Sequence, residues 1–315
     1  MRIVKINRKK NLKLAVASTT FVCLLSLSLM TWSNTIPKVL VLNSDATVDK
    51  YTIAQDEFSK ELPCFIQKVD LSQDKKIKDI EKIIENNSVS IIYCIGVKAC
   101  MSLHHYNRQE YIIFSSILNS FRLPMRSKTY GISNEILSGI QITLFRYIFP
   151  KINNIGVLYS EKYNQEWFDQ VQLEADRLGI KVMGSPVSES KKTLSELKNL
   201  LSQIHAFWLI SDPIITPNKE SLLKIISTCD SVKIPIFSYN QIFAELGVTM
   251  TVSVDDQTIG RQAADIAKQI VLSKKIDEHV QFPAGSHIVL NLKKVNAYSL
   301  EYNKDALSSI NTIIE

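Results

Sequence analysis

The pattern that most restricts the fold is a regular alternation of short apolar runs with amphipathic segments, which starts twice along the chain. Each run has the length of a strand and is predominantly apolar. The intervening segments have helical periodicity, as at 75–87, where Ile77, Ile80 and Ile84 share one face. The runs lie at 38–43, 64–71, 90–96 and 111–117, and then at 154–160, 180–186, 206–212 and 234–239. Apolar strands joined by helices are typical of parallel sheets, so the chain is predicted to be an α/β protein with two doubly wound parallel sheets in tandem.

Further elements follow the second series, and they predict a hinge. The run at 248–254 precedes a helix with Ile259 and Ile266 on one face, and strand-like segments follow at 279–282 and 288–292. About 280 residues follow the N-terminal segment, which is too many for one ordinary core. Elements beyond two complete lobes indicate that the chain returns to the first lobe and crosses back. We therefore expect two lobes joined by a multi-strand hinge.

The segment at 1–33 has the pattern of an export signal. Basic side chains occupy its start, and no charge follows from Leu14 to Ser33. A basic start stays on the cytoplasmic side while the apolar run enters the translocon. Thr31 and Ser33 form a small-x-small cleavage site, so we expect a signal peptide removed after Ser33. An uncleaved anchor helix is the alternative, because the run approaches the roughly 20 residues that span a bilayer. The remainder is predicted to be periplasmic or otherwise extracytoplasmic.

The charge of the remaining chain argues against nucleic acid as a partner. The whole chain has 37 basic and 31 acidic residues. Six of the basic residues lie in the export signal, namely Arg2, Lys5, Arg8, Lys9, Lys10 and Lys13. The other 31 balance the 31 acidic residues. The electrostatic attraction on which nucleic-acid binding depends is therefore missing.

The sequence contains no motif for catalysis, a metal or a cofactor. It has no G-x-S-x-G, no H-E-x-x-H, no P-loop and no G-x-G-x-x-G after the first strand. The histidine pair His104 and His105 is explained by a solvated helix end. The cysteines beyond the export signal are spaced neither for zinc nor for a disulfide scaffold. We favour buried thiols, with a local bridge between Cys94 and Cys100 as the alternative. We expect no enzymatic activity, no metal and no cofactor.

Polar and aromatic side chains just past the strands are the candidates for ligand binding. Parallel strands present their carboxyl ends to one crevice, where small ligands bind to side chains, backbone amides and helix N-termini. The candidates are Asn43, Ser44, Ser115, Ser116 and Asn119 in the first series, Tyr159, Ser160, Ser211, Asp212, Ser238 and Tyr239 in the second, and Asp255 at the return to the first lobe. Trp167 is a further aromatic residue that either stacks on a ligand or, as we favour, packs in the core.

Asp212 is the most specific of these candidates. It follows a buried strand and precedes Pro213. A carboxylate there can take a ligand ammonium through charge-assisted hydrogen bonds. Equally, aspartate before proline is a common start of a turn, and the two interpretations have similar weight. For Asp255 we favour capping of the following helix at Thr258 over ligand binding.

Four segments resemble, in the right order, the substrate-binding proteins of ABC transporters typified by tryptophan-binding lipoproteins. The segment at 255–275 (DDQTIGRQAADIAKQIVLSKK) resembles a helix of that family, and 288–300 (IVLNLKKVNAYSL) resembles its ending. The segment at 208–222 (WLISDPIITPNKESL) is similar to its Asp-Pro segment. The segment at 131–159 (GISNEILSGIQITLFRYIFPKINNIGVLY) is similar to its lobe-crossing helix and the next strand. The resemblance covers essentially all of the chain after the export signal.

The resemblance implies a type I periplasmic-binding fold. The first lobe would comprise 36–133 plus 252–280, and the second 134–251 plus 281–315. The implied protein is a monomer that captures a small polar solute, amino-acid-like or another small organic molecule, between its lobes for an ABC importer. Its partners would be that ligand and a membrane permease. The alternative is a membrane-tethered sensing module that reports ligand occupancy to a receptor or another envelope partner.

The chain departs from the family pattern after its fourth strand. The family has a segment there with an acidic residue, whereas this chain has Ser115, Ser116 and then 117–119 (ILN). The carboxylate expected at this position is missing. Arg122 and Arg126 bring positive charge nearby instead. An aromatic amino acid is therefore not carried over as the ligand.

Overall fold

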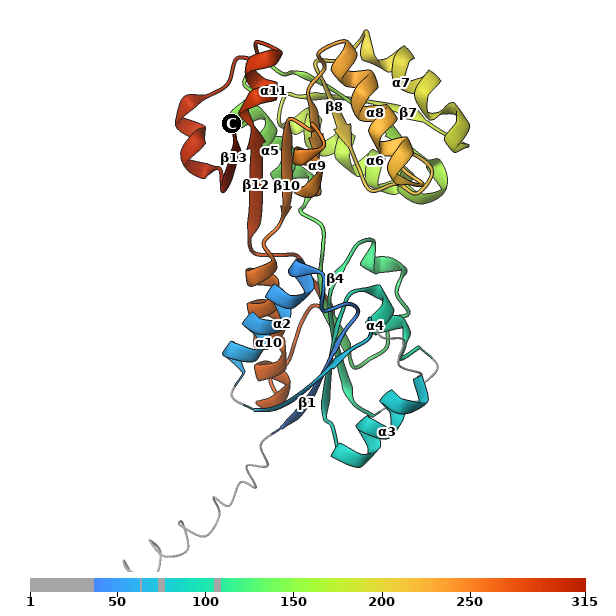
Figure 1. Cartoon of the computed structure of the whole chain (residues 1–315), viewed down its shortest axis with the longest axis vertical. Helices are drawn as coiled ribbons and strands as arrows, with labels where there is room; N and C mark the ends of the chain where they lie inside the picture. Colours follow the sequence, from blue (N-terminus) through green and yellow to red (C-terminus); the bar gives the residue numbers. More distant parts are fainter. Residues whose placement is uncertain (1–36, 63, 73–76, 105–108) are drawn as a thin grey trace, which may run out of the picture. The chain divides into compact units, whose positions relative to one another are not determined.

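The two series of strands fold into two separate sheets in the computed structural model, which describes residues 37–62, 64–72, 77–104 and 109–315 (Figure 1). The two-lobe α/β architecture is therefore confirmed. The predicted signal segment at 1–33 lies outside the described residues. Among the residues that are described, no helix is both long enough and apolar enough to cross a membrane.

The first sheet has six strands, all paired in parallel, in the order β11-β5-β4-β3-β1-β2. The strands are β1 (Lys38–Asn43), β2 (Phe65–Asp70), β3 (Ile91–Ile95), β4 (Tyr111–Ile117), β5 (Thr129–Ser133) and β11 (Val280–Gln281). The helices are α2 (Asp49–Glu61), α3 (Ile77–Asn87), α4 (Val97–Met101) and α10 (Asp256–Val271), and the short 3₁₀ helix η1 (Ser120–Arg122) follows β4. Helices α2 and α10 lie on one face of the sheet, and α3 and α4 lie on the other (Figure 1).

Strand β1 shows why the four central residues of its sequence, Val39 to Leu42, are all apolar. Val39 and Val41 belong to the hydrophobic core under α2 and α10. Leu40 and Leu42 point the other way and belong to the core under α3 and α4. Successive side chains of a strand point to opposite faces, so a strand covered on both faces has no polar position.

The second sheet has seven strands in the order β13-β12-β10-β9-β8-β6-β7. The strands are β6 (Asn154–Tyr159), β7 (Lys181–Pro186), β8 (Ala206–Leu209), β9 (Ile236–Ser238), β10 (Met250–Val254), β12 (Ser286–Asn291) and β13 (Thr312–Ile314). The helices are α5 (Ser138–Ile148), α6 (Glu161–Arg177), α7 (Thr193–Leu201), α8 (Lys219–Ser231), α9 (Ile242–Glu245) and α11 (Leu292–Ala297), with 3₁₀ helices η2 (Ser190–Lys192) and η3 (Lys304–Ser309). Cys229 of α8 and Cys94 of β3 are buried, as expected for thiols that pack as small apolar groups, whereas Cys64 and Cys100 are only partly buried.

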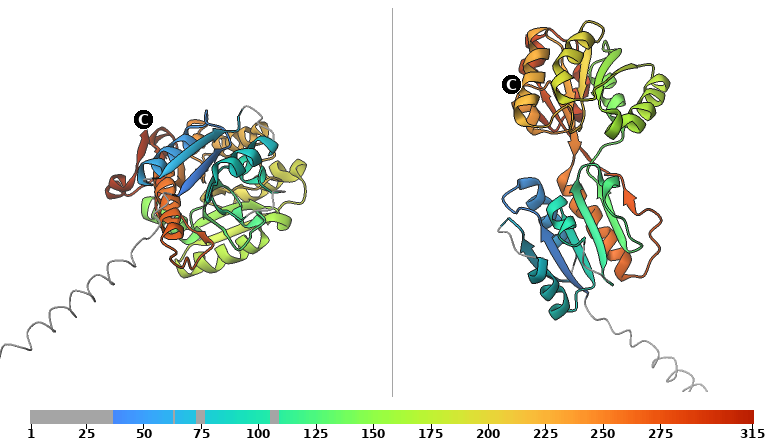
Figure 2. Two further views of the ribbon diagram at one scale, coloured as in Figure 1. Left: turned by 90° about the horizontal axis from the view of Figure 1, so that it is seen from below. Right: turned by 90° about the vertical axis from the view of Figure 1, so that its right-hand side faces the viewer.

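The prediction of a wholly parallel second sheet was wrong at one edge. Strand β12 runs antiparallel to β10, with Val252 opposite Ile288. The reason is the path of the chain. Strand β10 leads out of the second sheet towards α10, and β12 returns from the first lobe, so the two neighbouring strands run in opposite directions (Figure 2). The other pairs of this sheet are parallel.

The chain passes between the two sheets in three places. It leaves the first sheet after Ser133, returns to the first lobe after Val254, and leaves again after Gln281. The predicted lobe boundary at 251/252 falls inside β10, which hydrogen-bonds in the second sheet, so strand membership places that crossing after Val254. Three crossings agree with the predicted multi-strand hinge.

Helices α2 and α10 pack at very close range around Gly260. A Cβ atom at this position would lie 2.4 Å from the backbone oxygen of Ala54 and 2.8 Å from the Cβ of Glu57. Only a residue without a side chain allows this approach. The glycine of the G-R-Q-A-A segment therefore has a packing role in the first lobe.

Candidate functional site

A cavity of about 750 Å³ lies where the chain leaves β4, β5, β8, β9 and β10 and where α6 begins. Its lining comes from both lobes. The first lobe contributes Leu118, Asn119 and Phe121. The larger part comes from the second lobe, including the segment that enters α5 and the first turns of α6. Cavities of 300–1,000 Å³ are the usual size of small-molecule sites.

Aromatic side chains form one wall of the cavity. Trp208 of β8 is fully buried, and Trp167 of α6 packs edge-on against it with ring centroids 5.3 Å apart. Tyr239 follows β9 and packs edge-on against Phe243 at 5.6 Å. Burial raises the pKa of Tyr239, although its hydrogen bond with Ser211 acts in the opposite direction. Trp167 thus packs in the core, as favoured, and lines the cavity as well.

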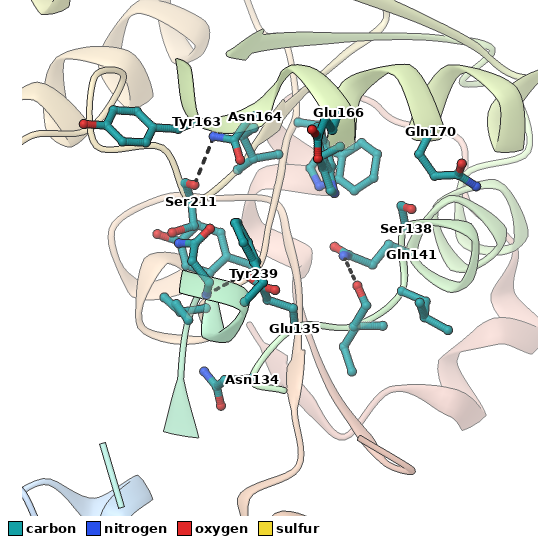
Figure 3. Close-up of a pocket in the computed structure, with 18 of the residues that line it drawn as sticks. Asn134, Glu135, Ser138, Gln141, Tyr163, Asn164, Glu166, Gln170, Ser211 and Tyr239 are labelled. Atoms are coloured by element: carbon teal, nitrogen blue, oxygen red, sulfur yellow. Dashed lines mark hydrogen bonds between the residues drawn. The ribbon is translucent and has the colours of Figure 1, made fainter. Parts of the chain in front are cut away.

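Two amide oxygens of the cavity lining have no hydrogen-bond partner among the described residues. The first is Oε1 of Gln141, a residue that is only 7% exposed on α5. Its Nε2 donates to the backbone oxygen of Ile136 at 2.8 Å, which fixes the amide orientation (Figure 3). The second is Oδ1 of Asn134, in the segment between β5 and α5. A buried polar atom without a hydrogen-bond partner destabilises the protein, so a hydrogen bond donated by a ligand to either oxygen would favour binding.

Glu135 also contributes a carboxylate to the lining of the cavity (Figure 3). Its Oε1 accepts a hydrogen bond from the backbone N–H of Asn119 at 2.9 Å. Burial raises the pKa of Glu135, against the opposing effects of that hydrogen bond and of the positive charge of Arg122. The lining therefore includes a carboxylate that follows β5, although the sequence has none directly after β4.

Both carboxylate oxygens of Asp212 accept hydrogen bonds from within the protein. One carboxylate oxygen accepts from the Ser160 N–H at 2.8 Å, the Ser160 Oγ at 2.6 Å and the Asn164 Nδ2 at 2.6 Å. The other accepts from the N–H groups of Ile214 and Ile215, at 2.8 and 3.3 Å. Burial acts to raise the pKa of Asp212, but these hydrogen bonds outweigh it and lower the pKa. Five internal donors support the turn interpretation over ammonium binding.

Of the twelve predicted positions, Asn119, Ser211 and Tyr239 line the cavity. Ser160 instead borders a smaller hollow of about 430 Å³ beside α6. In the second lobe, Tyr159 stacks on Phe168 at 4.4 Å. Ser238 donates to the backbone oxygen of Leu209 at 3.1 Å.

The predicted positions of the first lobe serve local structure. Ser44 Oγ accepts from the Ala99 N–H of α4 at 2.9 Å. Ser115 Oγ lies 2.7 Å from the hydroxyl of Tyr93, and Ser116 has a left-handed φ of 59° at an irregularity of β4. The side chain of Asn43 accepts from the N–H of Asp45 at 3.0 Å. Asp255 caps α10 by accepting from the Thr258 N–H at 3.1 Å, as favoured. A role of these residues in binding stays a prediction.

Sequence reasoning missed Asn134, Glu135 and Gln141. They lie beyond the strand end, in a segment interpreted only as a lobe crossing. Gln141 left one signal, because it occupies the same helical face as the buried Ile142, Phe145 and Ile148. A polar side chain on the buried stripe of an amphipathic helix needs a partner, and that need points to a site.

Comparison with known proteins identifies a family. The profile of a family described as ABC transporter substrate binding protein matches residues 66–313. Among solved structures, a ligand-free, open substrate-binding protein with adhesive properties from Clostridium difficile is 15% identical, with a TM-score of 0.72 over 89% of this chain and 99% of that one. An ABC domain from Streptococcus pneumonia in complex with L-Trp is 19% identical, with a TM-score of 0.60 over 89% and 100%. A conserved domain protein from Vibrio cholerae is 17% identical, with a TM-score of 0.60 over 89% and 100%. A comparison with curated protein sequences finds no match.

Proposed function

The chain belongs to the family of ABC transporter substrate-binding proteins, and from that premise we propose that its 750 Å³ cavity captures one small organic solute for a membrane permease of the ABC class. Proteins of this family bind a substrate for transport, so the chain is not an enzyme. The observation that carries the proposal is the cavity itself. It combines an aromatic wall with partnerless buried amide oxygens, and both lobes contribute to its lining.

Binding in this cavity couples to the hinge. The lining includes residues next to each crossing, namely Asn134, Val254 and Phe282. A ligand that contacts both lobes stabilises their closed arrangement relative to the open one, by the difference in its affinity for the two states. The permease then recognises the closed form. In this proposal the first lobe comprises 37–133 plus 255–281, and the second 134–254 plus 282–315.

The proposed place of action is outside the cytoplasm. The support is the basic start and the apolar run at 14–33, which are typical of an export signal. Cleavage after Ser33 would release the protein, and retention of the segment would tether it. Mass spectrometry of the exported protein decides between the two outcomes by the mass of its N-terminal peptide.

The test of the proposed function is a thermal-melting panel of amino acids, amines, nucleosides, small peptides and organic anions with the full chain. A ligand at 100 times its Kd adds about 2.7 kcal/mol to the stability of the folded state, which raises the midpoint by several degrees. At least one member of the panel is expected to do so. A panel in which no compound raises the midpoint would contradict the proposal.

Two variants locate the bound ligand. Trp167→Ala removes part of the aromatic wall and is expected to abolish most of the ligand-induced rise. Tyr147→Ala is the matched control, because this aromatic residue is exposed on α5 and is not part of the cavity lining. A ligand whose effect survives Trp167→Ala unchanged binds elsewhere.

A further inference from the structure

We propose that the cavity selects a protonated amine attached to an aromatic or apolar body, in preference to a zwitterion or an anion of similar shape. The inference rests on the proposed function, because it names the ligand class of the same cavity. It depends on which hydrogen-bonding groups of the lining are already used within the protein and which are open.

The open groups are acceptors. Oε1 of Gln141 and Oδ1 of Asn134 have no partner among the described residues, and Gln141 is more than nine-tenths buried. Glu135 adds a carboxylate between these two positions in the sequence. Each of these oxygens can accept an N–H donor of an ammonium group.

Four side-chain amides of the lining already donate at least one hydrogen bond each within the protein. Gln141 Nε2 donates to the Ile136 backbone oxygen, and Asn164 Nδ2 donates to Asp212. Gln165 Nε2 donates to Asp169 at 2.7 Å, and Gln170 Nε2 donates to Glu174 at 3.0 Å.

A carboxylate of the protein lies near the start of each helix that begins at the cavity. Helix α5 begins at Ser138, whose Oγ donates to Glu174 at 2.5 Å. Helix α6 begins after Ser160, whose N–H and Oγ both donate to Asp212. The positive ends of helix dipoles are common sites for ligand carboxylates. Here Glu174 and Asp212 occupy both places.

Most of the charged side chains that line the cavity are acidic. Four carboxylates line the cavity, and they belong to Glu135, Glu161, Glu166 and Glu174. The cationic side chain in the lining is Lys162, which is exposed and lies over the ring of Tyr163 at 5.0 Å. An acidic cavity concentrates cations, and aromatic faces add a cation–π attraction for an ammonium group.

Four indole ligands of similar size test the inference by calorimetry on the full chain at pH 7.5. Tryptamine is the amine, tryptophol the neutral analogue, indole-3-propionate the anion and L-tryptophan the zwitterion. Tryptamine is expected to bind about tenfold or more tightly than each of the others, because only the amine satisfies the open acceptors without adding a carboxylate. Equal or tighter binding of L-tryptophan or indole-3-propionate overturns the inference and leaves the proposed function standing. Failure of all four to bind also overturns it, while the proposed function is judged on the wider panel.

A pair of variants tests whether the Glu135 carboxylate binds the ammonium group of the ligand. Glu135→Gln is expected to weaken tryptamine binding by about tenfold or more and to change tryptophol binding by less than about threefold. Glu174→Gln removes a charge from the same cavity, but the carboxylate there already accepts from Ser138 and Gln170. Its effect on tryptamine should stay below about threefold. Equal losses in the two variants would contradict a specific ammonium site at Glu135, and retained tryptophol binding shows that each variant is folded.

Discussion

Asp256 lies at the start of α10, just after the second crossing between the lobes, where burial disfavours the ionised form of its carboxyl group. Burial is the main cause that raises the pKa of Asp256 from an ordinary 3.8 to about 6, and the charge of neighbouring Asp255 adds to it. The opposite charge of Lys50 reduces the shift. The folded protein therefore binds a proton at Asp256 more tightly than the unfolded chain does.

The sign of the effect on stability follows from this difference. Between pH 4 and pH 6 the folded state holds the proton of Asp256 and the unfolded state has released it, so stability from this group falls as the pH rises. At 1.36 kcal/mol per pKa unit, the loss above pH 6 reaches at most about 3 kcal/mol. Asp256→Asn removes the ionisation. Because an acidic side chain in the first turn also interacts favourably with the helix dipole, by about 0.3–1 kcal/mol, we expect a net gain of about 2 kcal/mol at pH 7.5.

The assay is urea unfolding of both proteins at pH 4.5, 6.0 and 7.5. The free energy of unfolding of Asp256→Asn minus that of the wild type is expected to be small at pH 4.5 and to rise to its plateau by pH 7.5. Asp265→Asn is the control on the same helix, where the carboxylate is exposed and pairs with Lys268 at 3.2 Å. It should change stability by less than about 1 kcal/mol at every pH. A difference for Asp256→Asn that does not depend on pH would refute the argument.

The remaining predictions concern three other positions. Asp212→Asn is expected to lower stability by about 2–4 kcal/mol at pH 7, because it disturbs a buried carboxylate with five internal donors. The ligand-induced rise in melting temperature should stay intact. Loss of ligand binding without loss of stability would contradict a structural role for Asp212. Since the pKa of Asp212 is lowered, its contribution is present at neutral pH and is lost as the pH falls through its folded pKa, which acid titration of the melting temperature can follow. Gly260→Ala should destabilise the protein by about 1–3 kcal/mol through the clash of the new Cβ with the Ala54 backbone. In the control Gly139→Ala, the new Cβ would lie 3.4 Å from its nearest neighbour, a Glu174 carboxylate oxygen, so urea unfolding should show neutral or increased stability. Glu135→Gln is expected to raise the melting temperature of the ligand-free chain at pH 7.5, because burial raises the pKa of Glu135, and an unchanged or lower midpoint would oppose that reasoning.

The elements of the fold could be predicted well from the sequence, because their signals are local. Val39 to Leu42 are apolar at four successive positions, which is the mark of a strand covered on both faces, and β1 contributes to cores on both sides. The helix at 77–87 follows from its spaced isoleucines. The cap at Asp255 follows from its spacing to Thr258. Each signal lies within a few residues, so the sequence determined it.

The tertiary structure alone decided the direction of β12 and the chemistry of the cavity. The antiparallel pair of β10 and β12 depends on the path through the first lobe, which no local pattern records. The five donors of Asp212 include Ser160 and Asn164, which precede it by 52 and 48 residues, so its sequence context could not separate a turn from a binding role. Hydrophobic periodicity reports whether a residue is buried, but whether a buried polar group finds a partner depends on segments far away in the chain. For Gln141 the bond from Nε2 is local, to Ile136 five residues earlier, whereas whether its Oε1 finds a partner depends on the more distant segments that surround the cavity.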